Sequence, residues 1–250
     1  MNLRTRTLFT VLLAGVSISG VSILGCDRAP GHPGPGPEVV RPEEVLDATV
    51  LYKTNCAACH GENGKDGVAI ALANPTYLAF AGEEALRDVT AKGIHGKLMP
   101  SFVRSAGGSL TDQQVSVLVH GIMQRWSNPG AFAGQTMPAY RASLPPDVSN
   151  GEKAYGTFCA SCHGDRGQGK TYTANGKTVK AGSIVDESYL SLISDQALRS
   201  FIVAGVPDGV MPDYRSDASV AMTDQQITDV VAWLAAKRTV NPGQPYATRP

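Results

Sequence analysis

The chain has 250 residues, enough for two ordinary domains, or for two small ones with an export segment and connecting stretches. Its 22 basic and 22 acidic side chains balance, so charge gives no reason to expect nucleic acid as a partner. The 27 glycines and 16 prolines predict many turns and loops between short elements.

The first stretch, 1–25, has the pattern of a secretory signal peptide: two arginines, an apolar run over 8–18, and then small residues. The run is too short and too rich in Ser and Gly for a comfortable membrane span. It ends in a sequence that resembles the lipobox of bacterial lipoproteins, Ile23-Leu24-Gly25-Cys26. The resemblance implies that Cys26 becomes the acylated first residue, and two or three acyl chains anchor a protein stably. A plain signal peptide or an uncleaved anchor, with an incidental cysteine, is the alternative.

A stretch rich in proline and glycine follows at 26–43, with no apolar period. Such a composition predicts a semi-extended tether that would hold the folded part away from the bilayer. Asp27 directly after the lipidated cysteine fits retention at the inner membrane, a rule that depends on lineage.

Two short runs share one arrangement of cysteine and histidine: Cys56-Ala57-Ala58-Cys59-His60 and Cys159-Ala160-Ser161-Cys162-His163. C-x-x-C-H is the attachment signature of a c-type haem. Its two thiols can form thioethers to the two vinyl groups of one porphyrin, and the adjacent histidine then becomes the proximal iron ligand. A redox disulfide or a zinc half-site is the alternative for a single copy. Two copies with matching downstream patterns predict two covalently bound haem c groups.

The two runs belong to an internal repeat. Cys159 follows Cys56 by 103 residues, and further on the spacing becomes 112, where Met99-Pro100 matches Met211-Pro212. The nine extra residues of the second copy are expected in the polar loop 170–180.

Each copy is expected to begin with a helix that runs into its attachment turn, from about Pro42 and from about Asn150. Tyr52 and Tyr155 both stand four residues before the first cysteine of their run. At that spacing the tyrosine ring lies on the helix face that meets the cysteines.

A middle helix is expected at 82–92 and at 194–204, each followed by a glycine suited to a helix C-terminus, Gly93 and Gly205. The last helix of each copy should open with a capping box, a threonine followed three residues later by glutamine, at Thr111 and Thr223. Apolar residues then recur at helical spacing: Val115, Leu118, Val119 and Ile122, and Ile227, Val230, Val231 and Leu234. No strand pattern of any length is present, so the predicted fold is all-α.

The distal iron ligand of the second copy follows by elimination. After His163 the chain has no histidine, and its methionines are Met211 and Met222. Met222 directly precedes the cap of the last helix, where a packing role fits better. Met211 is followed by a proline that fixes φ and stiffens the loop, so we predict Met211 as the ligand. A Met/His site raises the reduction potential and suits an electron carrier.

The first copy offers five distal candidates: His95, Met99, His120, Met123 and Met137. Met99 aligns with Met211 and is also followed by proline, so it is preferred. His95 is the main rival, although its counterpart in the repeat is Pro207. Met137 stands in a similar Met-Pro-Ala-Tyr sequence but follows the last helix, where it could pack in a linker or exchange with Met99.

With these features each copy resembles a small class I cytochrome c domain. The resemblance implies a few short helices wrapped around a covalently attached haem, with one haem edge exposed near the attachment turn. The ligand sets that it implies are Cys56, Cys59, His60 and Met99 in the first copy and Cys159, Cys162, His163 and Met211 in the second. The chain then divides into a signal peptide (1–25), tether (26–43), first domain (44–127), linker (128–147), second domain (148–238) and tail (239–250).

The expected function is that of a lipid-anchored dihaem cytochrome c, periplasmic at the outer face of a bacterial plasma membrane, that carries single electrons and is not an enzyme. Its expected partners are a quinol-oxidising complex on one side and a terminal oxidase, reductase or photosynthetic reaction centre on the other. One alternative is an electron-transfer subunit fixed in such a complex. Another is a dihaem peroxidase-type enzyme, which the matched methionines disfavour because it needs a vacant distal position.

Overall fold

The computed structural model describes residues 36, 39–174, 176–207, 211–215 and 221–239. The predicted signal peptide, Cys26, most of the tether and nearly all of the tail lie outside these residues. The contacts divide the chain into two units, 1–40 and 41–250, and the description below concerns the second.

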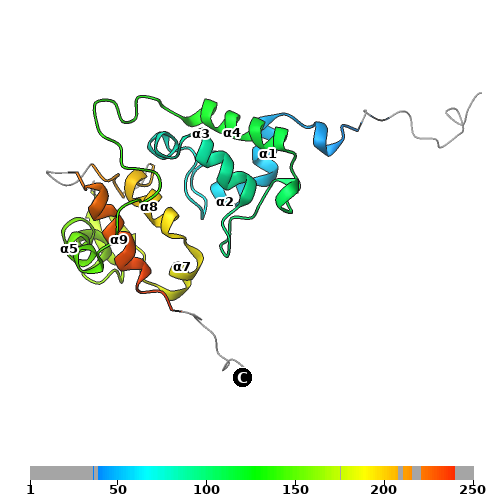
Figure 1. The fold of residues 1–250 in the computed structure, drawn as a ribbon. Helices are drawn as coiled ribbons and strands as arrows, with labels where there is room; N and C mark the ends of the chain where they lie inside the picture. The colour runs from blue at the N-terminus through cyan, green and yellow to red at the C-terminus, as the bar shows by residue number, and fades with distance from the viewer. Residues whose placement is uncertain (1–35, 37–38, 175, 208–210, 216–220, 240–250) are drawn as a thin grey trace, which may run out of the picture. The chain divides into compact units, whose positions relative to one another are not determined.

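The described part of the second unit is mostly helical, which confirms the all-α prediction apart from one hairpin (Figure 1). The first copy of the repeat contains η2 (Pro42–Glu44), α1 (Ala48–Asn55), α2 (Ala57–His60), α3 (Pro75–Lys92), η3 (Arg104–Ala106) and α4 (Asp112–Trp126). The second contains α5 (Val148–Phe158), α6 (Ala160–His163), β1 (Lys170–Ala174), β2 (Lys177–Ala181), α7 (Glu187–Leu192), α8 (Asp195–Ala204) and α9 (Asp224–Ala235). No helix in the described part of the chain is long and apolar enough to cross a membrane.

The hairpin corrects the prediction of a polar loop at 170–180. Strands β1 and β2 pair antiparallel, with Tyr172 opposite Val179, across a two-residue connection that contains Gly176 at φ +72°. An Asn-Gly pair between two alternating runs is a strong hairpin signal, and the sequence contains it at 175–176. The prediction was wrong because each strand is only five residues long and mostly polar, which hides the period of two.

The middle helix of the first copy begins earlier than expected. Asn74 caps α3, accepting a hydrogen bond from the Tyr77 amide, and the helix is broken at Gly82, where φ is +70°. Gly82 aligns with Ser194, which caps α8 in the second copy. The two halves of α3 therefore correspond to α7 and α8, which are separate helices.

The capping boxes at the start of α4 and α9 are confirmed. Thr111 accepts a hydrogen bond from the Gln114 amide, and Gln114 accepts one from the Thr111 amide. Thr223 and Gln226 repeat the pair. Gln114 does more than cap: its buried side chain also donates to the Pro42 carbonyl (2.7 Å), which ties η2 to α4.

Each copy has its own apolar core. The first is built on Leu78, Leu118 and Val119, and the second on Leu190, Ile227 and Val230. In each, the first and last helices pack together, α1 on α4 and α5 on α9 (Figure 1). Two buried residues join the other copy's core: Phe80 of α3 and Ala204 of α8.

Candidate haem sites

The two cysteines and the histidine of each motif lie on one continuous turn of backbone. Cys56 is the C-terminal cap of α1 and the N-terminal cap of the four-residue helix α2, and the His60 amide donates to the Cys56 carbonyl at 2.9 Å. Helix α6 repeats this, with the His163 amide donating to the Cys159 carbonyl at 2.9 Å. The local sequence thus brings two thiols and one imidazole together within a single turn in both copies.

The first histidine is set for coordination through one nitrogen. Nδ1 of the buried His60 lies 2.7 Å from the Ile70 carbonyl oxygen, so Nδ1 carries the proton and Nε2 keeps its lone pair. Burial lowers the pKa of His60, with the Ile70 carbonyl opposing it, and the neutral imidazole is the form that binds metals. A hydrogen bond to the far nitrogen also fixes the ring orientation of a ligating histidine.

The second histidine differs in this detail. Nδ1 of His163 is buried and makes no hydrogen bond with any described residue. Burial lowers its pKa, with the backbone of Gly182 close enough to oppose the shift without completing a hydrogen bond. The two copies therefore share a neutral imidazole but support it differently.

A tyrosine locks each attachment turn. The Tyr52 hydroxyl donates to the Gly61 carbonyl at 2.7 Å, and the Tyr155 hydroxyl donates to the Gly164 carbonyl. These glycines directly follow the motif histidines, so each tyrosine connects the helix before the cysteines to the chain after the histidine. The sequence placed the rings on the correct helix face, but it contained no signal for the carbonyl acceptors.

The Met-Pro segments take equivalent places in the two copies. The Ile94 amide donates to the Met99 carbonyl (2.9 Å), and the Val206 amide donates to the Met211 carbonyl (3.0 Å). Gly93 and Gly205 have positive φ and pack directly on these segments. In both copies the residue after the helix-end glycine therefore bonds the carbonyl of the methionine.

Comparison with known families agrees with this geometry. Residues 148–237 match the family model "Cytochrome c", and residues 43–120 match the model "Cytochrome C oxidase, cbb3-type, subunit III". The chain contains cytochrome c domains.

Three curated relatives carry similar sequences. A thiosulfate dehydrogenase from Stutzerimonas stutzeri (strain A1501) is 30% identical over 46% of this chain and 39% of its own length. One from Psychrobacter arcticus is 25% identical over 75% of this chain and 57% of its own. The cbb3-type cytochrome c oxidase subunit CcoP of Cereibacter sphaeroides is 25% identical over 74% and 58%. The chain thus spans 39% to 58% of the length of these relatives.

The cytochrome c domains imply covalently bound haem c, and their side chains fit that group. Burial raises the pKa of the Cys56 and Cys159 thiols to about 12, with the neighbouring motif cysteine as the second cause. The four cysteines in the described part of the chain are unpaired by disulfides, so their sulfurs are available for thioethers. Two thiols and a neutral imidazole on one turn are the donor set that haem c requires.

The other distal candidates of the first domain lie in different surroundings from Met99. Met123 packs against the apolar core of this domain, and His120 is exposed on α4. His95 is exposed, whereas Met99 is partly buried.

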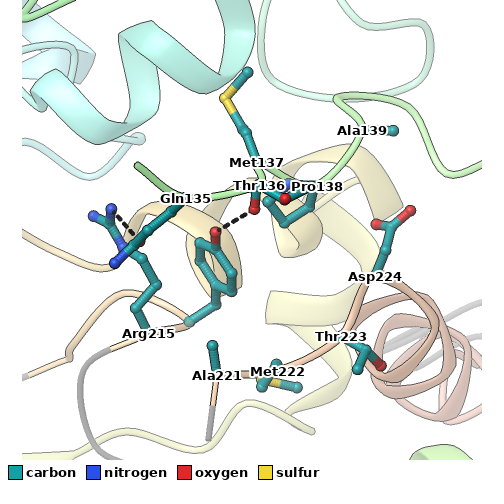
Figure 2. Close-up of a pocket in the computed structure, with 11 residues that line it drawn as sticks. Gln135, Thr136, Met137, Pro138, Ala139, Arg215, Ala221, Met222, Thr223 and Asp224 are labelled. Atoms are coloured by element: carbon teal, nitrogen blue, oxygen red, sulfur yellow. Dashed lines mark hydrogen bonds between the residues drawn. The ribbon is translucent and has the colours of Figure 1, made fainter. Parts of the chain in front are cut away.

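Met137 belongs to a segment that packs on the second domain, and its own side chain is exposed. It lines a hollow of about 610 Å³ together with Tyr214, Arg215 and Met222 (Figure 2). The Tyr214 hydroxyl donates to the neighbouring Thr136 carbonyl at 3.1 Å, and in Figure 2 the Met137 side chain points away from Met222. The contacts of its segment are therefore those of packing on the second domain.

Proposed function

We propose that this chain is a membrane-anchored dihaem cytochrome c that carries single electrons between respiratory or photosynthetic redox partners. The observation that carries the proposal is the duplicated turn with two thiols and a neutral imidazole, one in each cytochrome c domain. When bound, haem c supplies one-electron redox chemistry. The chain's own residues attach the group, orient its proximal ligand and exclude water from it.

In this proposal both haems have the same kind of ligand pair. His60 and Met99 hold the first iron, and His163 and Met211 hold the second. The matched hydrogen bonds of the two Met-Pro carbonyls support equivalent roles for the two methionines. A thioether ligand raises the reduction potential, which suits a carrier rather than a site that binds a substrate.

The anchor in this proposal is Cys26, acylated after removal of residues 1–25, with the protein on the periplasmic face. Intact mass spectrometry of membrane-extracted protein tests the anchor and the haem count together. The expected mass is that of a chain starting at Cys26 with two haems and two or three acyl chains. A Cys56→Ser, Cys59→Ser double variant should lose one haem mass. A soluble mature protein without acyl mass contradicts the anchor, and a single haem in the wild type contradicts the dihaem assignment.

The distal ligands are tested by the far-red absorption band that a methionine–iron bond produces in the oxidised protein. Met99→Ala and Met211→Ala should each remove about half of the band, because each removes one of two equivalent thioethers. His95→Ala and Met137→Ala are the matched controls and should leave it intact. A band that keeps its full intensity in Met99→Ala but falls by about half when Met137 is also replaced would assign the first iron to Met137.

The relatives named thiosulfate dehydrogenase favour a second candidate, an enzyme that oxidises thiosulfate. The relative named as a cbb3 oxidase subunit favours a fixed place in a larger complex. Rapid haem reduction by thiosulfate alone would support the enzyme, and slow or absent reduction supports the carrier. Co-purification with an oxidase in mild detergent would support the fixed subunit. Turnover of a reduced donor by peroxide would instead indicate a peroxidase.

A further inference from the structure

The two cytochrome c domains contact each other close to Met211 at one point and close to Met99 at another. Asn74 begins α3 in the first domain, is 4% exposed, and donates its side-chain amide to the carbonyls of Ala204 (3.0 Å) and Gly205 (3.4 Å) in the second. In a second contact of the same direction, the Lys97 amine of the first domain donates to the Ser191 carbonyl of α7 at 2.5 Å.

The backbone that Asn74 contacts also contacts Met211. A Cβ on Gly205 would stand 2.7 Å from the Met211 carbonyl oxygen, and the next residue, Val206, donates its amide to that oxygen. The backbone at 204–206 is thus held by Asn74 on one side and holds Met211 on the other. Buried carbonyls need partners, so the amide of Asn74 is required where it stands.

The turn that contains Lys97 is likewise hydrogen-bonded to Met99. Lys97 lies two residues before Met99, in the turn closed by its own amide to the Ile94 carbonyl (3.0 Å). The Ile94 amide in turn donates to the Met99 carbonyl at 2.9 Å. The anchor for this turn, the Ser191 carbonyl, belongs to the second domain.

Neither contact is inherited from the repeat. The counterpart of Asn74 is Asp186, which caps α7 by accepting from the Tyr189 amide but has no amide to donate. The counterpart of Lys97 is Gly209, which has no side-chain amine. The two contacts are therefore specific to the way these domains are joined.

We propose that each domain holds the other's methionine segment in place: Asn74 positions the Met211 segment, and the Ser191 carbonyl positions the Met99 segment through Lys97. The proposal rests on the proposed function in taking these methionines as distal ligands. Separation of the domains would loosen both distal ligands, so close packing of the domains and methionine ligation are coupled.

Amide hydrogen exchange in the full-length holoprotein tests the proposal with a matched pair of reporters. The Val206 amide reports the Met211 segment and the Ile94 amide reports the Met99 segment. Asn74→Ser keeps a good N-cap for α3 but is too short to reach Ala204. It should speed exchange at Val206 about tenfold relative to Ile94, because the buried hydrogen bonds of the Asn74 amide to Ala204 and Gly205 are lost. The Tyr77 amide, which the serine still caps, should stay protected.

Lys97→Met keeps the apolar stem without the amine and is the reciprocal variant. It should speed exchange of the Ile94 amide several-fold relative to the Val206 amide. The ratio of the two exchange rates then changes in the opposite direction from that in Asn74→Ser. In a Met99→Ala background, Asn74→Ser should also weaken the far-red band that remains from Met211. The proposal is overturned if Asn74→Ser leaves the ratio of the Val206 and Ile94 exchange rates unchanged. It is also overturned if only the Tyr77 amide exchanges faster. If the wild type lacks the far-red band, the ligand assignment fails, while the exchange ratio still decides whether the domains hold each other's segments.

Discussion

At the scale of single residues, Gly93 and Gly205 have two separate reasons to be glycine. Both have positive φ, +68° and +63°, which residues with a Cβ rarely adopt. Both also lie against the backbone of their Met-Pro segment, where a Cβ on Gly93 would stand 2.5 Å from the Pro100 carbonyl carbon. Their positions in the sequence predict helix ends, and the structure adds the contact with the Met-Pro segment.

Gly93→Ala therefore should displace the Met99 segment, and Gly96→Ala is its matched control. Gly96 has nearly the same φ, +67°, but a Cβ there would meet no described atom within 4 Å. Gly96→Ala should cost about 1 kcal/mol of unfolding free energy for backbone strain alone. Gly93→Ala should cost about 2 kcal/mol more, because its neighbour is backbone that must shift. Urea unfolding monitored by circular dichroism measures both, and equal losses would contradict the contact.

At the scale of elements, the crossing of the first and last helices solves one packing problem in two ways. In the first domain Ala48 of α1 meets Gly121 of α4, and in the second Gly151 of α5 meets Trp233 of α9. In the repeat, Ala48 corresponds to Gly151 and Gly121 corresponds to Trp233. The first domain therefore has two small residues at this crossing, whereas the second has a glycine and a tryptophan. The first crossing leaves a hollow of about 30 Å³.

Trp233 also packs beside Tyr155, the tyrosine that bonds the attachment turn of the second domain. It stacks on Tyr155 with ring centroids 4.3 Å apart, whereas Tyr52 in the first domain meets the edge of Trp126 at 5.1 Å. Trp126 comes from a different position of the repeat, five residues beyond Gly121. An aromatic neighbour for the tyrosine is thus kept although its position in the last helix has changed.

Gly121→Ala should destabilise the first domain, and Ala48→Gly should rescue it. A Cβ on Gly121 would stand 2.3 Å from the Ala48 Cβ, so overpacking should cost about 1–2 kcal/mol net of the gain in helix propensity. In the Ala48→Gly background the clash is gone and the same change should stabilise by about 0.5–1 kcal/mol. Thermal or urea unfolding of the four variants completes the cycle. The explanation fails if Gly121→Ala changes the unfolding free energy in the same direction in both backgrounds.

Gly151→Ala has no such rescue. A Cβ on Gly151 would stand 2.1 Å from the Asp229 backbone carbonyl oxygen, which no side-chain substitution removes. The loss should therefore exceed that of Gly121→Ala, which the same unfolding measurements would show.

At the scale of the whole molecule, the stretch expected as a linker packs on the second domain. The buried Arg199 donates to the Ala139 carbonyl (3.0 Å), and Gln225 donates to the Pro145 carbonyl (2.9 Å). Arg199 also pairs with Asp224 in α9. The charged group thus joins the stretch before the second domain to that domain's last helix.

A holo-fragment starting at residue 128 should be more stable than one starting at 146, which keeps Asp147, the cap of α5. Without the stretch, the Arg199 guanidinium loses its carbonyl partner while it stays largely buried, at a cost of about 1–3 kcal/mol. For a domain of this size, that corresponds to a loss of at least about 5 °C in Tm. Scanning calorimetry of the two fragments measures this difference in Tm. The Arg199→Met variant of the longer fragment is the control, and its Tm should fall most of the way to that of the shorter fragment. Equal Tm values would mean that 128–145 contributes nothing to the second domain.

Much of the site could be predicted from the sequence because the chemistry of attachment is local. The two thiols and the histidine lie within five consecutive residues, and capping boxes depend on residues three apart, so both are legible in a linear pattern. The repeat added the Met-Pro segments, since duplication preserves order and spacing. The hairpin was missed because its strands are short and polar, although its Asn-Gly turn was present.

The sequence by itself predicted which residues attach haem, and it determined where the last helices begin and that the chain is built from one unit used twice. Only the tertiary structure decided which carbonyls those residues meet: Ile70 for His60, Gly61 for Tyr52, and Ala204 for Asn74. The physical reason is that a backbone carbonyl is the same group at every position, so its use as a partner leaves no mark on residue identity. A contact such as Asn74 to Ala204, 130 residues apart, exists only once the two domains have packed together.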